Sequence, residues 1–137
     1  MAIPYLACMA MVAATLHLPP RVLPSIQRVE GGSIGSISRN ANGTADLGLM
    51  QINTVWLAPL ARISGLPEDA VQRRLIADPC FNIAAAGLIL RQHLVQRHGD
   101  LMQAIGDYHS VTPALNERYR SAVWDAATRL FVRTASH

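Results

Sequence analysis

The chain has 137 residues, a length that predicts a single domain over residues 1–137 with a hydrophobic core of its own. Half of its residues are hydrophobic and 15% are charged, which excludes an intrinsically disordered chain, and no apolar run reaches the roughly 20 residues that span a membrane. All twelve basic residues are Arg and the net charge is +3, which suits an anionic polymer as partner. The sequence has no basic stripe interleaved with aromatic residues, so we expect no nucleic-acid partner.

The N-terminal segment predicts a core helix over about residues 5–17, because apolar residues recur there at helical spacing and the proline pair at 19–20 ends the pattern. The residues at this spacing are Leu6, Met9, Ala13 and Leu16. No positive charge precedes the apolar residues 2–16, which argues against a signal peptide. If the protein is exported, its signal has been removed or lies upstream of this chain. We expect residues 1–4 to be frayed.

A second helix is predicted over about residues 21–30, and it ends in a carboxyl group on its apolar face. Leu23, Ile26 and Glu30 lie at i, i+3 and i+7, so Glu30 points toward the core, and Gly31 follows as a helix stop. Burial and the negative end of the helix dipole both disfavour the charged carboxylate and raise its pKa. A carboxylic acid that stays protonated near neutral pH is suited to general acid catalysis. The alternative is an exposed helix-terminal glutamate without a role.

Residues 31–47 predict a loop or a small irregular hairpin, with Asn42 and Gly43 as its turn. The segment holds one more carboxylate, Asp46, and residues 48–52 after it predict a compact buried strip. Gln51 is polar between apolar neighbours, and a buried amide needs partners. It either braces the loop backbone or reaches a bound ligand.

The remaining segments predict helices with identifiable starts. Asn53 or Thr54 caps a helix to about residue 64 that carries Trp56. We expect Trp56 in the core, and the alternative is a platform for a bound ligand. A short helix opens near residue 67, and a long central helix runs from 78 to about 98. We expect the two histidines of that helix, His93 and His98, to be solvated and without a role.

The C-terminal part predicts two more helices. Asp100 caps the first, and Tyr108 and His109 stand at its end. Thr112 caps the second, which runs over about 113–132, and residues 133–137 are expected to fray. Its inward-facing positions are Leu115, Tyr119, Ala122, Val123, Ala126 and Leu130.

Three motifs in order resemble family 1 lytic transglycosylases, whose catalytic unit is the lysozyme-like SLT domain. Val29-Glu30-Gly31-Gly32 followed by the run Asp46 to Asn53, reading DLGLMQIN, is similar to the family signature. Residues 104–110, reading AIGDYHS, with Thr112-Pro113 and then Tyr119 and Val123, are similar to its later tyrosine motif. Residues 78–80 and 82–84 match the helix between the two motifs. The resemblance covers roughly residues 8–130. The His-Ser pair after the tyrosine resembles the small members that accompany type IV and type III secretion, conjugation or pilus systems.

Two positions depart from the family pattern. Gly31 stands where most members carry a serine, so that either Ser33 or Ser36 supplies the hydroxyl or nothing does. His109 stands where an asparagine is usual.

The resemblance implies a mainly α, lysozyme-like helical domain with a small irregular hairpin beside the active-site cleft. It also implies peptidoglycan as the substrate, with Glu30 protonating the glycosidic oxygen between N-acetylmuramic acid and N-acetylglucosamine and then acting as base on the muramic 6-hydroxyl. Met50 and Gln51 are expected to steady the N-acetyl group. The other expected substrate contacts are Asp46, Asn53, Tyr108 and His109. No metal or cofactor is needed.

The resemblance further implies a periplasmic monomer that acts on glycan strands beside an envelope-spanning secretion or pilus complex. Cys8 and Cys80 lie where secretion-linked members carry cysteines, so a disulfide between them is expected in an oxidising compartment. Two buried free thiols are the alternative. Without a nearby histidine cluster they do not make a zinc site.

Two rival functions stay open. The central block also resembles c-type lysozymes, in which an aspartate stands where Asp46 does, so Glu30 and Asp46 are candidates for the paired carboxyl groups of a hydrolase. Asp46 as a turn carboxylate that accepts backbone N–H bonds is the alternative. The second rival is a glycan-binding or assembly module with weak catalysis, which the glycine at position 31 keeps open.

Overall fold

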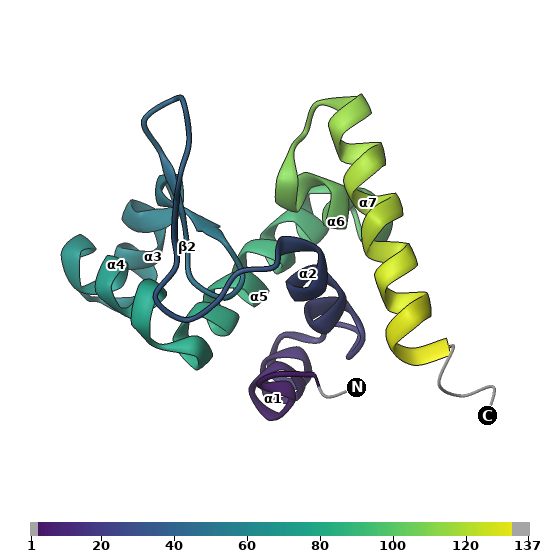
Figure 1. The fold of residues 1–137 in the computed structure, drawn as a ribbon, viewed down its shortest axis with the longest axis horizontal. Helices are drawn as coiled ribbons and strands as arrows, with labels where there is room; N and C mark the ends of the chain where they lie inside the picture. The colour runs from purple at the N-terminus through teal and green to yellow at the C-terminus, as the bar shows by residue number, and fades with distance from the viewer. Residues whose placement is uncertain (1–2, 133–137) are drawn as a thin grey trace.

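The computed structural model describes residues 3–132, which form mainly α-helices together with one small antiparallel sheet. Figure 1 shows helix α5 between two groups of elements, with β2, α3 and α4 on one side and α6 and α7 on the other. The α-helices are α1 (Leu6–Leu16), α2 (Val22–Glu30), α3 (Leu57–Ser64), α4 (Glu68–Ala77), α5 (Pro79–Gln96), α6 (Leu101–His109) and α7 (Pro113–Ala127). This arrangement confirms the expected mainly α fold with a small hairpin region. The ends 1–2 and 133–137, expected to be frayed, lie outside the described residues.

Local sequence signals account for most helix ends. Gly31 and Gly65 end α2 and α3 at φ values of 67° and 73°, the left-handed region that glycine adopts without steric cost. The Asp100 carboxylate accepts the N–H of Gln103, so the predicted N-cap of α6 is confirmed, and the Asp78 carboxylate accepts the N–H of Phe81 in the same way at the start of α5. The Thr112 side chain makes no such bond, which corrects the expected cap of α7.

The three strands follow α2 directly. They are β1 (Ile37–Arg39), β2 (Ala45–Leu47) and β3 (Ile52–Asn53), paired antiparallel in the order β1-β2-β3. The predicted hairpin therefore forms, with Gly43 in its turn at a φ of 87°. Asn53 ends β3 and caps the 3₁₀-helix η1 (Thr54–Trp56), because its side-chain oxygen accepts the N–H of Val55 at 2.9 Å. A second short element, η2 (Thr128–Val132), extends α7.

Helix α5 is the central support of the fold. It packs against α1, α4 and α6. The disulfide between Cys8 and Cys80 joins α1 to the first turn of α5, so the expected pairing forms in this structure. Ile83, Ala86 and Leu90, which share one face of α5, are fully buried.

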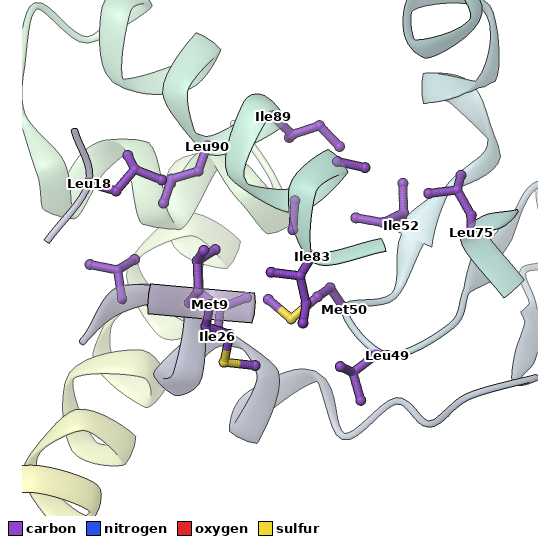
Figure 2. Packing of buried hydrophobic residues seen from close by; sticks show 14 of the residues in the cluster. Met9, Leu18, Ile26, Leu49, Met50, Ile52, Leu75, Ile83, Ile89 and Leu90 are labelled. Carbon is purple, nitrogen blue, oxygen red and sulfur yellow. The ribbon is translucent and has the colours of Figure 1, made fainter. Parts of the chain in front are cut away.

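The hydrophobic core lies where α1, α2 and α5 meet the strip after the hairpin. Figure 2 shows Met9, Ile26, Ile83 and Met50 gathered at this meeting point. Three residues expected to face inward do not: Leu6 is 45% exposed, Leu115 is 39% exposed and Ala122 is exposed. All three lie on helices that cover the outside of the core, where helical spacing indicates one face but not how far the neighbouring elements reach over it.

Within residues 3–132, no helix has the length and apolar character needed to cross a membrane.

Candidate active site

A cavity of about 490 Å³ brings the predicted site residues together. Its walls come from the end of α2, the hairpin, η1, α5 and the end of α6. The lining includes Glu30, Asp46, Gln51, Asn53, Tyr108 and His109, which are six of the seven residues expected to act on substrate. The volume lies within the range of small-molecule and substrate sites.

Glu30 closes the helical side of this cavity. As the last residue of α2, it is carried inward by the helix face that buries Leu23 and Ile26 completely. The Tyr119 hydroxyl of α7 donates a hydrogen bond to Glu30 Oε2 at 2.6 Å. Burial raises the Glu30 pKa from 4.5 to about 7, the Tyr119 bond works against that rise, and the negative charge of Asp46 adds to it. The carboxyl group is thus held near the pKa that suits an acid catalyst at neutral pH.

An aromatic cluster supports Glu30 from α6 and α7. The rings of Tyr108 and His109 stack on the Tyr119 ring with centroids 6.4 and 5.1 Å away. Burial raises the pKa of both tyrosines, so their hydroxyl groups remain donors at neutral pH. The Tyr108 hydroxyl donates to the Met50 carbonyl oxygen at 2.9 Å, which ties the end of α6 to the strip after the hairpin.

Asp46 lies on the opposite wall, within strand β2, and its partners are side-chain amides. Asn53 Nδ2 donates to Asp46 Oδ1 at 3.0 Å and Asn40 Nδ2 donates to Asp46 Oδ2 at 3.3 Å. The same two amides also donate to the Thr44 hydroxyl, at 3.1 Å in each case. The backbone N–H partners expected for this carboxylate are therefore replaced by a polar ladder of side chains that faces the cavity.

Gln51 braces the loop, which is the first of its two alternatives, because its amide donates to the Gly48 carbonyl at 3.0 Å and to the Ser36 hydroxyl at 3.2 Å. It also lines the cavity, and its contact with a bound ligand stays a prediction. The backbone of Gly32 passes so close to the Gly48 and Leu49 carbonyls that a Cβ there would clash with them. This close approach keeps the loop after Glu30 against the strip that carries Gln51.

The backbone of this loop explains why a glycine, Gly31, stands where the family pattern has a serine. Gly31 has a positive φ of 67°, so an L side chain there is strained, although there is open space around it. Of the two serines considered in its place, Ser36 donates to the Gly48 carbonyl at 3.3 Å and accepts the Gln51 amide. The Ser33 N–H in turn donates to the Ser36 hydroxyl at 3.4 Å.

Met50 lies beneath the cavity and does not line it. Its side chain is fully buried, its N–H donates to Asn82 Oδ1 at 2.8 Å, and its carbonyl accepts from Tyr108. Asn82, fully buried on α5, also donates to the carbonyls of Leu47 and Leu75 at 2.9 and 2.8 Å. One amide therefore fixes the strip that positions both Met50 and Gln51.

On the cavity wall formed by η1 and α5, one prediction from the sequence is wrong. Trp56 packs against the core as predicted, and it also lines the cavity. His93 is half-buried beside it, with ring centroids 5.9 Å apart and an edge-to-face angle of 87°, so the expectation of a solvated His93 is wrong. His98, as expected, is exposed. Asp107 is 7% exposed and accepts a bidentate pair of bonds from Arg97 at 2.6 and 2.7 Å.

Sequence reasoning missed three groups of the site. Tyr119 was expected to face inward, but its bond to Glu30 was not predicted. The hairpin residues Asn40, Asn42 and Thr44 were given no place in the site, although they line the cavity. His93 was predicted to be solvated and without a role. Helical spacing offered a signal for it, because His93 lies one turn after the apolar residue Ile89 and therefore on the same helix face. In residues 3–132, no group of three or more His, Cys, Asp or Glu side chains is arranged to hold a metal ion.

Comparisons with known proteins agree with the motifs. The family model described as Transglycosylase SLT domain matches residues 7–130. Invasion protein IagB of Salmonella typhimurium (strain SL1344) is 30% identical over 100 residues, which are 70% of this chain and 59% of IagB. Protein IpgF of Shigella sonnei is 28% identical over 138 residues, which are 98% of this chain and 87% of IpgF. The match thus covers less than two thirds of the length of IagB.

Proposed function

This chain belongs to the family of transglycosylase SLT domains, and from that premise we propose that it is a lytic transglycosylase that cuts peptidoglycan without water. The observation that carries the proposal is Glu30, a carboxyl group with a pKa raised to about 7 in the wall of a substrate-sized cavity. A single carboxyl group suffices for this reaction because the substrate supplies its own nucleophile.

The proposed reaction has two proton transfers through Glu30. The protonated carboxyl gives its proton to the glycosidic oxygen between N-acetylmuramic acid and N-acetylglucosamine as the bond from the muramic C1 breaks through an oxocarbenium-like state. The resulting carboxylate then takes the proton of the muramic 6-hydroxyl while that oxygen bonds to C1. A 1,6-anhydro ring closes and Glu30 is protonated again. Tyr119 donates to the carboxylate formed between the two steps, which stabilises it.

The opposite wall is suited to holding the sugars. Gln51 and Asn53 are expected to contact the N-acetyl group and ring hydroxyls, because both amides line the cavity beside Asp46. Tyr108 and His109 border the same cavity next to Tyr119. Met50 acts through its backbone, as the anchor for the Tyr108 hydroxyl.

One specific observation favours a second function, hydrolysis by a pair of carboxyl groups. Asp46 lines the same cavity as Glu30, and its charge contributes to the raised Glu30 pKa. In that reaction water attacks the sugar carbon and Asp46 stabilises the positive charge or the attacking water. The product is then a reducing end in place of an anhydro ring.

The place of action is part of the proposal. A disulfide such as that between Cys8 and Cys80 forms in oxidising compartments, which supports a periplasmic location. Similarity to a protein named for invasion supports a role in opening the cell wall locally for an envelope-spanning complex.

Product analysis tests the proposal. Purified peptidoglycan sacculi are digested with this protein, and the soluble products are measured by mass spectrometry, with Glu30→Gln as the control. Products one water lighter than ordinary disaccharide peptides are expected. Hydrated reducing ends instead identify the hydrolase, and a folded protein that binds sacculi but releases no sugars identifies a binding module.

A further inference from the structure

His93 lines the cavity from α5, between the apolar and aromatic side chains of Ile89 and Trp56 and the polar groups of Gln96, Arg97 and Asp107. It comes one turn after Ile89, which is 3% exposed and faces the same cavity. Its ring meets the Trp56 ring edge-to-face. Its Nδ1 atom is buried and has no hydrogen-bond partner within the described residues.

An unpaired buried nitrogen costs stability, because the atom has lost its water without gaining a partner. An apolar side chain at this position would pack against Trp56 without that cost. Unpaired buried polar groups occur at functional sites, because these sites are often less stable than the rest of the fold as a consequence of their activity. The position of His93 in the cavity wall therefore points to a partner that arrives from the cavity.

The charged groups near His93 do not supply that partner. Burial lowers the pKa of His93, which keeps the imidazole neutral, while a hydrogen bond with the Gln96 side chain and the charge of Asp107 raise that pKa and the charge of Arg97 lowers it. Both oxygens of Asp107 already accept bonds from Arg97. A neutral imidazole offers one donor and one acceptor, which matches an uncharged hydroxyl or acetamido group rather than an ion.

We propose that His93 is a binding residue for the glycan strand, in which Nδ1 hydrogen-bonds a hydroxyl or acetamido group of a sugar unit seated against Trp56. The proposal rests on the proposed function, because it assumes a polysaccharide in the cavity. Because Nδ1 is buried in this structure, the proposal requires a half-turn of the ring about its Cβ–Cγ bond, which exchanges the positions of Nδ1 and Cδ2.

The role is binding and not proton transfer. Glu30 lines the cavity from the end of α2, whereas His93 and Trp56 line it from α5 and η1, so the acid and the His93–Trp56 pair come from different elements of the wall. A change at His93 is therefore expected to weaken affinity for the glycan and to leave the pH dependence set by Glu30 in place.

The test measures binding in the absence of turnover. In the full chain carrying Glu30→Gln, the dissociation constant for the β-1,4-linked tetramer of N-acetylglucosamine is measured by calorimetry. Adding His93→Leu is expected to weaken binding about three- to tenfold, the effect of one lost hydrogen bond. Adding His93→Asn is expected to restore most of it, because the Asn amide reaches the position of Nδ1. His98→Leu, at an exposed position outside the cavity, is the matched control and is expected to leave the dissociation constant unchanged.

A thermal melt separates binding from support of the fold. His93→Leu removes the unpaired nitrogen, so its Tm is expected to equal or exceed that of the parent. Unchanged affinity in His93→Leu overturns the proposal, as does a lowered Tm together with weak binding that His93→Asn does not restore. Failure of the tetramer to bind any variant overturns it as well. His93-dependent binding by a wild-type chain that releases no products from sacculi leaves this inference standing and overturns the proposed function.

Discussion

The two walls of the cavity hold carboxyl groups in opposite ways. On the helical wall, Glu30 is desolvated and has one protein donor, the Tyr119 hydroxyl, and its pKa rises to about 7. On the hairpin wall, Asp46 is matched oxygen by oxygen with the amides of Asn53 and Asn40. Burial without full pairing produces a group that gives up a proton readily near neutral pH, whereas full pairing produces a fixed polar surface. The proposed function places proton transfer on the helical wall and the binding of sugars on the hairpin wall.

The sharpest test of this division compares one substitution on each wall. Glu30→Gln removes the acid and is expected to lower kcat/KM on sacculi by about 10²–10⁴-fold, the usual contribution of general acid catalysis. Asp46→Asn leaves Glu30 in place and is expected to lower kcat/KM by less than about tenfold, the effect of about one lost hydrogen bond. The rate at which soluble products appear from sacculi is measured for both variants. Equal losses in the two variants contradict the division and favour a hydrolase with paired carboxyl groups.

The hairpin wall depends on a single amide from α5. Asn82→Ala leaves the Met50 N–H and the carbonyls of Leu47 and Leu75 without their partner in a buried site. We expect a loss of about 3 kcal/mol in the free energy of unfolding, since several buried groups become unsatisfied at once. Urea denaturation measures it. Asn40→Ala, on the exposed part of the hairpin, is the control and is expected to stay within about 0.5 kcal/mol of wild type.

The helical wall is expected to make stability depend on pH through Glu30. Its pKa is about 7 in the folded chain against 4.5 as the reference value, so between these values the folded state holds a proton that the unfolded chain releases. The stabilisation is complete below pH 4.5 and is lost as the pH rises through about 7. Between these two pH values, we expect the free energy of unfolding of wild type to fall by about 2–3 kcal/mol relative to that of Glu30→Gln. Urea denaturation of both proteins at several pH values checks this, and parallel curves contradict it.

The smallest effect is a shift in the alkaline limb of the pH–rate profile, and it has opposite signs for two variants. Activity is expected to fall as Glu30 loses its proton, with a midpoint near the pKa of about 7. Tyr119→Phe removes the bond that lowers the Glu30 pKa and moves the limb to higher pH, whereas Asp46→Asn removes a negative charge that raises it and moves the limb to lower pH. Shifts of the same sign in both variants would show that neither group acts on Glu30 as described.

The sequence was informative wherever the physical cause is local. Gly31, Asp78 and Asp100 mark helix ends because caps and stops act within a few residues, and the face that carries Leu23 and Ile26 inward also carries Glu30. The partners of Glu30 were not accessible in the same way. The bond from Tyr119 joins residues 89 positions apart, and helical spacing shows which side of a helix is buried but not which side chain it meets.

The hairpin wall shows the same limit. The turn at Asn42 and Gly43 is a local signal, yet the ladder that holds Asp46 depends on the register that places Asp46 opposite Asn53. Gln51 was recognisable as a buried amide in need of partners, but the partners themselves come from Ser36 and Gly48 after the loop folds back. Resemblance to a family supplied what local physics could not, namely that these segments meet in one cleft.

The most direct measurement of the central claim is the titration of Glu30 itself. The chain is labelled with ¹³C at the glutamate carboxyl carbon, the Glu30 signal is assigned by its absence in Glu30→Gln, and its chemical shift is followed from pH 3 to 9. A midpoint near 7 is the predicted result and means that the helical wall keeps the acid protonated under working conditions. A midpoint near 4.5, the reference value, would mean that Glu30 is an ordinary carboxylate and that the division between the two walls is wrong.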